Sequence, residues 1–343
     1  MKSIRKTPFA FFLFFAFSLL LLIISSISAK ACETIDTQIC QRIRLLLSNI
    51  SSIVPFSVFE FFVFALPFFI FFALKYIASG ESDYKTRFYR VLSALSLFVS
   101  LYILALGISY KSPSPFSEYS KPVSTDDLIA CASALADAVN TESEFITDEP
   151  TFESICDEAS AAFATATEKY GFKTGKLPRP KPLISSKLVS YTGALAIYSF
   201  PTGEVNINVN APKYTIPFTV LHELGHSRGA VSETDANFLA YLISLESDSH
   251  FLRYSAALSI LEYMLADLKR TNCDAYSECL QGLSERARMD INSWHKYSEK
   301  YQKSLLFAVL DSSNTRHLER WDKNGGAAYS TVTVYVTNYL NSA

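Results

Sequence analysis

Three long apolar runs in the first third of the chain constrain its fold more than any other feature. They cover residues 8–29, 54–77 and 91–110, and the first and third contain no charged residue. About 20 residues of α-helix cross a hydrocarbon core of roughly 30 Å. Each run is long enough to do so, and we predict a three-helix transmembrane region over residues 1–110.

The first run has a second interpretation, because basic residues precede it and residues 29–31 resemble a signal-peptide cleavage site. Its apolar stretch is longer than that of most signal peptides, which favours an uncleaved membrane anchor. Either interpretation places the following loop on the far side of the membrane.

Basic residues in short loops tend to stay in the cytoplasm and so set the orientation. They precede the first run and fill the loop between the second and third: Lys2, Arg5, Lys6, Lys75, Lys85, Arg87 and Arg90. Residues 30–52 and everything after residue 110 are then expected outside. The bias is incomplete, since residues 30–52 carry three basic residues as well.

The cysteines fall only in segments that this orientation places outside, which favours an oxidising compartment. Sequence does not fix their connectivity. Neighbouring positions suggest three disulfides, Cys32–Cys40, Cys131–Cys156 and Cys273–Cys279. A zinc cluster is the less favoured alternative, because no CxxC pair occurs.

The rest of the chain predicts mainly α-helix with a small β-sheet, an α+β domain over residues 128–343. Residues 111–127 are rich in Pro and Ser and are expected to be a linker. Apolar and Asn residues alternate over 204–210, as in a strand with one wet face. An exposed edge of that strand could hold an extended peptide, although an ordinary amphipathic strand explains the pattern equally well. Residues 330–336 also have strand-like chemistry.

The segment LHELGHSRGAVSETDANF, residues 221–238, carries the clearest chemistry. On a helix, His222 and His226 lie on one face and can present two imidazoles to one ion, while Glu223 can address a water bound to it. Zinc suits such a site, since catalytic zinc commonly has three protein ligands and one water. The alternative is a helix with two ordinary core or surface histidines.

A third ligand is expected on the next helix. Gly229 can end the first helix, Ser232 can cap the second, and Asp235 can complete an approximate capping box. Glu233 is then free to reach the metal, and Asn237, one turn later, can hydrogen-bond a ligand imidazole. Ordinary acidic enrichment at a helix N-terminus also explains Glu233, and Asp235 is the reserve metal candidate.

HELGH followed by SETDAN resembles the gluzincin branch of zinc metallopeptidases, in which HExxH is completed by Glu in an ExxA(D/N) segment. Segments at 54–60, 178–198, 200–229, 233–242 and 252–263 further resemble a bacterial multi-pass membrane family, domain-of-unknown-function family thirty-eight ten. The resemblance implies a zincin-like fold, bound Zn²⁺ and peptidase activity, with His222, His226 and Glu233 as ligands and Glu223 as catalytic base. That family has no established function, so it supplies no substrate.

The sequence differs from the family's pattern at two positions. Asp235 stands where the family often has Glu, and Asn237 stands where soluble relatives often have Asp. Neither change removes a proposed ligand.

Other candidates are weaker. The remaining histidines, His250, His295 and His317, are expected to be surface or structural residues. Tyr191 or Tyr198 could polarise an oxyanion. Arg228 could clamp a substrate carboxylate, but a solvent-facing residue at a helix end is the simpler reading. Interfacial placement explains Glu60 near the outer end of its span.

The sequence therefore predicts a membrane-anchored zinc metalloprotease that hydrolyses peptide bonds of a peptide or protein substrate, in an extracytoplasmic domain attached to the lipid bilayer. The alternatives are a catalytically inactive zincin-like module that binds a partner protein, and a purely structural membrane protein. A net charge of −2 provides no basic field for nucleic acid, which is not expected as a partner.

Overall fold

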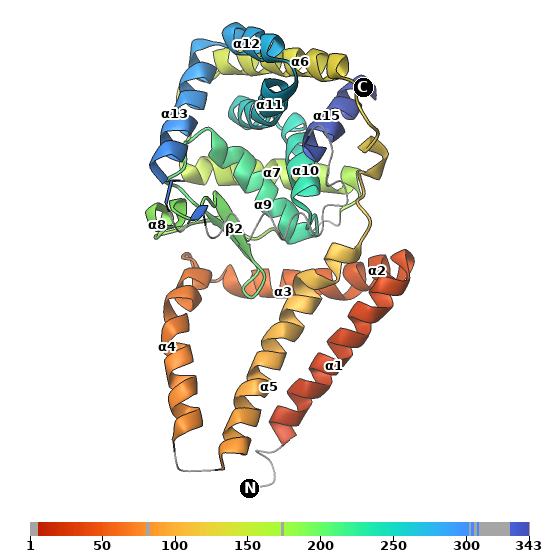
Figure 1. The fold of residues 1–343 in the computed structure, drawn as a ribbon, viewed down its shortest axis with the longest axis vertical. Coiled ribbons are helices and arrows are strands. Elements are labelled where there is room, and N and C mark those ends of the chain that lie inside the picture. The colour runs from red at the N-terminus through yellow and green to blue at the C-terminus, as the bar shows by residue number, and fades with distance from the viewer. Residues whose placement is uncertain are drawn as a thin grey trace.

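The computed structural model describes residues 6–79, 83–172, 175–301, 303–304, 307–308 and 330–342. Within them, three helices are long and apolar enough to cross a membrane, at Phe9–Ile27, Val58–Ala78 and Tyr84–Lys111. The first belongs to α1 (Lys6–Ile27), the second is α4, and the third comprises α5 (Tyr84–Tyr102), η2 (Ile103–Gly107) and η3 (Ser109–Lys111). These helices lie at one end of the molecule, below a helical domain (Figure 1).

A layer of shorter helices crosses the upper ends of the three long ones (Figure 1). It consists of α2 (Ala29–Ile35), η1 (Asp36–Cys40) and α3 (Gln41–Ser51). In α3 the usual arrangement of side chains is reversed. Gln41, Arg44 and Ser48 are buried, whereas Leu46 and Ile50 are 60% and 58% exposed.

The domain above this layer is built mainly from helices that pack around α11 (His250–Thr271), whose side chains Leu252, Ile260 and Met264 are fully buried. The other helices are η4 (Ser117–Tyr119), α6 (Thr125–Glu144), α7 (Phe152–Ala166), η5 (Thr167–Tyr170), α8 (Ser186–Ser190), α9 (Thr215–Arg228), α10 (Glu233–Leu245), α12 (Cys273–Gly282), α13 (Glu285–Tyr301) and α15 (Thr331–Ser342). The chain is therefore mainly α, as its sequence predicts.

One small sheet accompanies the helices, with strand order β1-β3-β2. Its strands are β1 (Lys181–Pro182), β2 (Ala196–Ser199) and β3 (Glu204–Ile207). β3 pairs parallel with β1 and antiparallel with β2. The predicted strand thus exists, but the predictions of a wet face and an exposed edge are wrong. β3 is central, and Asn206 and Asn208 are fully buried.

The buried Asn side chains donate hydrogen bonds to protein groups instead of to water. Nδ2 of Asn208 donates to the carbonyl of Ala194 at 2.9 Å, and Nδ2 of Asn206 donates to the carbonyl of Ile197 at 3.3 Å. Asn at alternating positions here satisfies loop and strand carbonyls instead of facing solvent.

The strand prediction for residues 330–336 is also wrong, because Thr331–Ser342 forms the helix α15. Val332, Tyr335 and Val336 are buried and recur at a spacing of three and four residues, which places them on one helical face. That face packs against α6, α10 and α11. Tertiary packing therefore overrides the β-propensity of these residues.

The three predicted disulfides are wrong for this structure, in which all six cysteines are free. Cys32 and Cys40 lie eight residues apart along continuous helix, about 12 Å at 1.5 Å per residue, whereas a disulfide needs Cα atoms within about 7 Å. Cys273 and Cys279 share the helix α12 in the same way. Cys131 and Cys156 belong to different helices, α6 and α7.

The domain is fixed to the helices below it by buried polar contacts. Glu60, near the start of α4, accepts hydrogen bonds from the backbone N–H groups of Ile184 and Ser185 at 2.9 and 2.7 Å. In the other direction, Glu204 of β3 accepts from the N–H groups of Val58 and Phe59 at 3.0 and 2.8 Å. Interfacial placement of Glu60 is therefore only part of its role.

The segment 111–127 also packs on the domain. Phe116 is 4% exposed, and its ring lies 4.9 Å from that of Phe238 on α10. Ser114 Oγ donates to Oδ1 of Asp235 at 2.5 Å. These contacts hold the connection between the three apolar helices and the domain in place.

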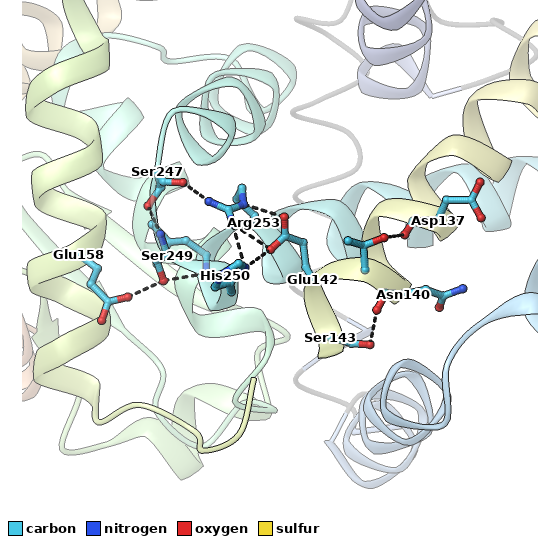
Figure 2. Close-up of polar contacts among 11 residues, drawn as sticks. Asp137, Asn140, Glu142, Ser143, Glu158, Ser247, Ser249, His250 and Arg253 are labelled. Carbon is cyan, nitrogen blue, oxygen red and sulfur yellow. Dashed lines mark hydrogen bonds and ion pairs between the residues drawn. The ribbon is translucent and has the colours of Figure 1, made fainter. Parts of the chain in front are cut away.

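A second polar network joins α6 to the start of α11 (Figure 2). Glu142 accepts from Nε of Arg253 at 2.7 Å and lies 2.7 Å from Nδ1 of His250. Ser249 caps α11 and donates to Glu158 of α7. His250 therefore has a structural role in tying α11 to α6, while Ser249 ties α11 to α7.

Candidate metal centre

The two helices that carry the HExxH and SETDAN segments meet at a short turn. Gly229 ends α9 in the left-handed region, with φ of 104°. Ser232 then caps α10, since its hydroxyl accepts from the N–H of Asp235 at 3.0 Å. Helix end, turn and cap lie where the sequence predicts them. Together they direct the first turn of α10 toward the last turn of α9.

His222, His226 and Glu233 come together at this corner, each offering a ligand atom within 4.8 Å of the others. Nε2 of His222 lies 3.2 Å from Oε2 of Glu233, and Nε2 of His226 lies 3.6 Å from Oε1. Among the described residues, this is the cluster of three His, Cys or acidic side chains that could hold one ion.

A hydrogen bond at Nδ1, the ring nitrogen that does not face Glu233, orients each imidazole. That atom of His222 lies 2.7 Å from Oδ1 of Asn237, and that of His226 lies 2.7 Å from the carbonyl oxygen of Ala230. Because a carbonyl oxygen only accepts, each Nδ1 carries the proton and donates. In the neutral form of each ring the lone pair is then on Nε2, the atom that faces Glu233. Metal-ligating histidines are oriented by the same arrangement.

The charges in the cluster depend on one another. Partial loss of hydration disfavours ionised Glu233, although its side chain is still 55% exposed, but the hydrogen bond and charge of His222 outweigh this and lower the pKa of Glu233 to about 2. Burial likewise disfavours protonated His222, yet Glu233 raises the pKa of His222 to about 9. Burial and the charge on His222 lower the pKa of His226 to about 4. The site thus stabilises one positive charge between three donors.

Glu223 is buried beside the cluster and does not join it. Burial raises its pKa to about 7, while a hydrogen bond from the backbone N–H of Tyr198 acts in the opposite direction. Its Oε2 atom has no hydrogen-bond partner. A carboxylate that is half-ionised near neutral pH and has a free oxygen is suited to exchange protons.

Asp235, the reserve ligand, is directed elsewhere. It is buried and accepts from Ser114, a residue of the connecting segment. Burial raises its pKa, which the hydrogen bonds from Ser114 and Ser232 oppose. The structure therefore favours Glu233 over Asp235 as the third donor.

A cavity of about 410 Å³ opens over the cluster. Its lining includes Ala196, Ile197 and Tyr198 of β2. Sequence reasoning missed two tyrosines that also line it, Tyr110 at the outer end of the third apolar helix and Tyr263 of α11. No spacing relative to HExxH distinguishes these from the other tyrosines.

Of the weaker candidates, Tyr198 lines the cavity, whereas Tyr191 packs against Tyr301 with ring centroids 5.0 Å apart. Arg228 is buried and donates to the carbonyl of Gly175 at 2.5 Å, so neither a substrate clamp nor a solvent-facing residue describes it. His295 is exposed on α13. His317 lies outside the described residues.

Comparison with known proteins supplies a family and no characterised relative. The family model described as "Protein of unknown function (DUF3810)" matches residues 36–337. No curated protein and no solved structure matches the chain.

Proposed function

This chain belongs to the family of proteins of unknown function DUF3810, and we propose that it is a membrane-anchored zinc metallopeptidase with a zincin-like domain. The convergence of His222, His226 and Glu233 within 4.8 Å of one another carries the proposal. Two imidazoles and one carboxylate are a common ligand set of catalytic zinc in peptidases.

The residues fit the ion in three respects. Their donor atoms face one another, and their Nδ1 atoms are held by Asn237 and Ala230. The cluster favours positive charge, because Glu233 stays ionised between two imidazoles. All three residues also line the cavity, so a peptide that enters it would approach a bound ion.

The chemistry divides between the ion and the chain. Bound zinc would polarise a peptide carbonyl and lower the pKa of a ligated water to about 7. Glu223 takes the proton of the attacking water on its free Oε2 atom, because burial raises the pKa of its carboxyl group to about 7. It then returns that proton to the leaving amine. Tyr110 and Tyr263 line the cavity and are our candidates for binding the carbonyl oxygen.

We also propose that all three apolar helices cross the membrane and that the domain faces the exterior. The basic residues Lys75, Lys85, Arg87 and Arg90 lie around the ends of α4 and α5 that are remote from the domain. By the positive-inside rule that end is cytoplasmic. Labelling of a cysteine introduced at Lys176 from the outside of intact cells tests the orientation.

Zinc analysis of the purified full-length chain tests the site. We expect one zinc per chain, a loss of at least tenfold in zinc content for His226→Ala, and no change for His295→Ala, which alters an exposed histidine. A folded parent protein without zinc would favour a binding module over an enzyme. Cleavage that persists in Glu223→Gln would reject the catalytic assignment while leaving the metal site intact.

A further inference from the structure

The active-site cavity is built partly from a membrane helix. Leu106 and Tyr110, at the outer end of the third apolar helix, line the same cavity as His222 and Glu233. The site is therefore close to the end of that helix, and its depth relative to the membrane can be inferred from the elements around it.

The helix α3 marks the membrane surface. On its exposed side, Leu46 and Ile50, followed by Ile53 at 82% exposure, form an apolar patch flanked by the exposed Arg42 and Asn49. Amphipathic helices commonly lie in the interfacial plane of a bilayer. Gln41, Arg44 and Ser48 are buried against protein, so the side with the apolar patch is the one left for lipid.

The HExxH helix rests on this surface layer. Arg44 of α3 is 1% exposed and bonds to Asp36, to the carbonyl of Ala105 at 2.9 Å and to Ser109 at 2.7 Å. A Cβ atom at Gly229, the end of α9, would come within 2.8 Å of the Arg44 guanidinium. Gly229 follows His226 by three residues, and a helix with its side chains is about 10–12 Å across, so the metal site lies within about that distance of α3.

The strand β2 leads from the membrane helix to the site. Phe200, directly after β2, packs against Phe98 and Tyr102 of α5, with ring centroids 5.4 and 5.3 Å apart. Tyr198 and Ala196, two and four residues earlier, line the cavity. At about 3.3 Å per residue the lining therefore begins roughly 7 Å from Phe200 and extends to roughly 13 Å.

The outer edge of β2 pairs with no described strand, although the N–H of Tyr198 on that edge bonds to Glu223. In the sheet order β1-β3-β2, β2 is at the edge. The N–H of Asn208 donates to the carbonyl of Leu195 at 2.9 Å, so Leu195 bonds inward to the sheet. In an antiparallel pair the bonding direction alternates, which directs the backbone groups of Ala196 outward. An extended peptide paired there would run between the membrane helix and the metal.

We propose that the substrate is a polypeptide anchored in the same membrane and cut about two to four residues outside the bilayer, at 3.3–3.6 Å per extended residue. This assignment rests on the proposed peptidase function. The bonds from Ile184 to Glu60 and from Val58 to Glu204 join the domain to α4 and keep it at this height above the membrane. A substrate in the same bilayer also gains effective concentration over a soluble one.

Mapping cut positions tests the proposal. The full-length protein is placed in vesicles with a reporter that has one transmembrane helix and an outer stretch of about 40 residues of random sequence, flexible enough to reach any height. The same random stretch without the helix is the soluble control. We expect cuts to cluster within about ten residues of the membrane, at least tenfold faster than in the soluble control and absent with Glu223→Gln.

Cuts spread evenly along the stretch, or equal rates on the soluble control, would overturn the substrate assignment but leave the peptidase intact. No cut in either format, from a protein that contains zinc, would overturn the peptidase and the substrate assignment together.

Membrane depth can be measured without any activity. Single cysteines at Ile50 and Ile53, in a Cys273→Ser background, carry a spin label whose collisions with lipid-soluble oxygen report depth. We expect high oxygen accessibility at both positions and low accessibility at Met289, which is equally exposed at 60% but lies on α13. Equal, water-like values at all three positions would remove α3 from the membrane surface and reject the proposal.

Discussion

Asn237 follows His222 by fifteen residues in the chain, yet its Oδ1 atom lies 2.7 Å from Nδ1 of that imidazole. The contact joins two helices and fixes the ring so that Nε2 points at Glu233. Asn237 thereby orients a candidate metal ligand without providing a donor of its own.

Replacement of Asn237 by Ala should weaken zinc binding about 10–100-fold, because the imidazole loses the partner that fixes its orientation and tautomer. Asn237→Asp keeps an oxygen acceptor and should lose much less. Zinc release to a chelator of known affinity measures the change. Asn292→Ala, at an exposed position of α13, is the control and should equal the parent. An unchanged affinity in Asn237→Ala would remove the orienting role.

Replacement of Glu223 by Gln should leave zinc content unchanged and slow peptide cleavage by about 10²–10⁴, the usual contribution of a positioned proton acceptor. The reason is that Gln fills the same space but accepts no proton. The measurement combines zinc analysis with the reporter cleavage described above. The exposed Glu278→Gln on α12 is the matched control for the loss of one negative charge.

Replacement of Gly229 by Ala should lower the free energy of unfolding by about 1–2 kcal/mol through its positive φ alone. The added methyl group would also press on the Arg44 guanidinium, 2.8 Å from the new Cβ. Thermal unfolding in lipid discs measures both effects together. Gly282→Ala is the control, since nothing lies within 4 Å of its new Cβ, and it should change stability by less than about 0.5 kcal/mol.

Glu262 of α11 should make stability depend on pH. Burial raises its pKa to about 7, and the nearby Asp290 adds to the rise, while a hydrogen bond from Tyr214 opposes it. A carboxyl whose pKa is higher in the folded state contributes stability below its unfolded pKa, and this contribution is lost as pH rises through about 7.

Stability should therefore fall on the order of 1–3 kcal/mol from pH 5 to pH 8 through this group. Glu262→Gln should flatten that part of the profile, while Glu278→Gln should leave it as in the parent. Melting temperatures at both pH values measure the difference. Identical profiles for the parent and Glu262→Gln would show that the carboxyl has solvent access.

Short-range rules predicted much of the metal corner. The helical spacing of His222 and His226, the glycine stop and the serine cap are all set within a few residues, and the structure has them where they were predicted. The choice between Glu233 and Asp235 was also local, since Ser232 binds the N–H of Asp235. Ser114, which takes up the Asp235 carboxylate, lies more than a hundred residues earlier in the chain, and no local rule could identify it.

The errors share one physical cause. The Asn residues of β3 and the β-branched residues of α15 follow patterns that are typical of exposed strands, but partners distant in the chain determined their surroundings. The cysteines were paired by proximity in sequence, although positions eight and six residues apart on a helix cannot meet. Glu60 appeared as a boundary residue, and its bonds to Ile184 and Ser185 depend on an arrangement that only the folded chain has.

The buried polar side of α3 limits how far this protein can be shortened from its N-terminus. A fragment that starts after residue 110 would expose the surface of the domain that α3 covers. Lys181 is 2% exposed and bonds to both Glu204 and the carbonyl of Ser51. In the fragment it would lose that carbonyl and become exposed to water. The end of α9 would lose its contact with α3. We therefore expect a stable fragment to retain α3, which lies within the residues 36–337 that match the family.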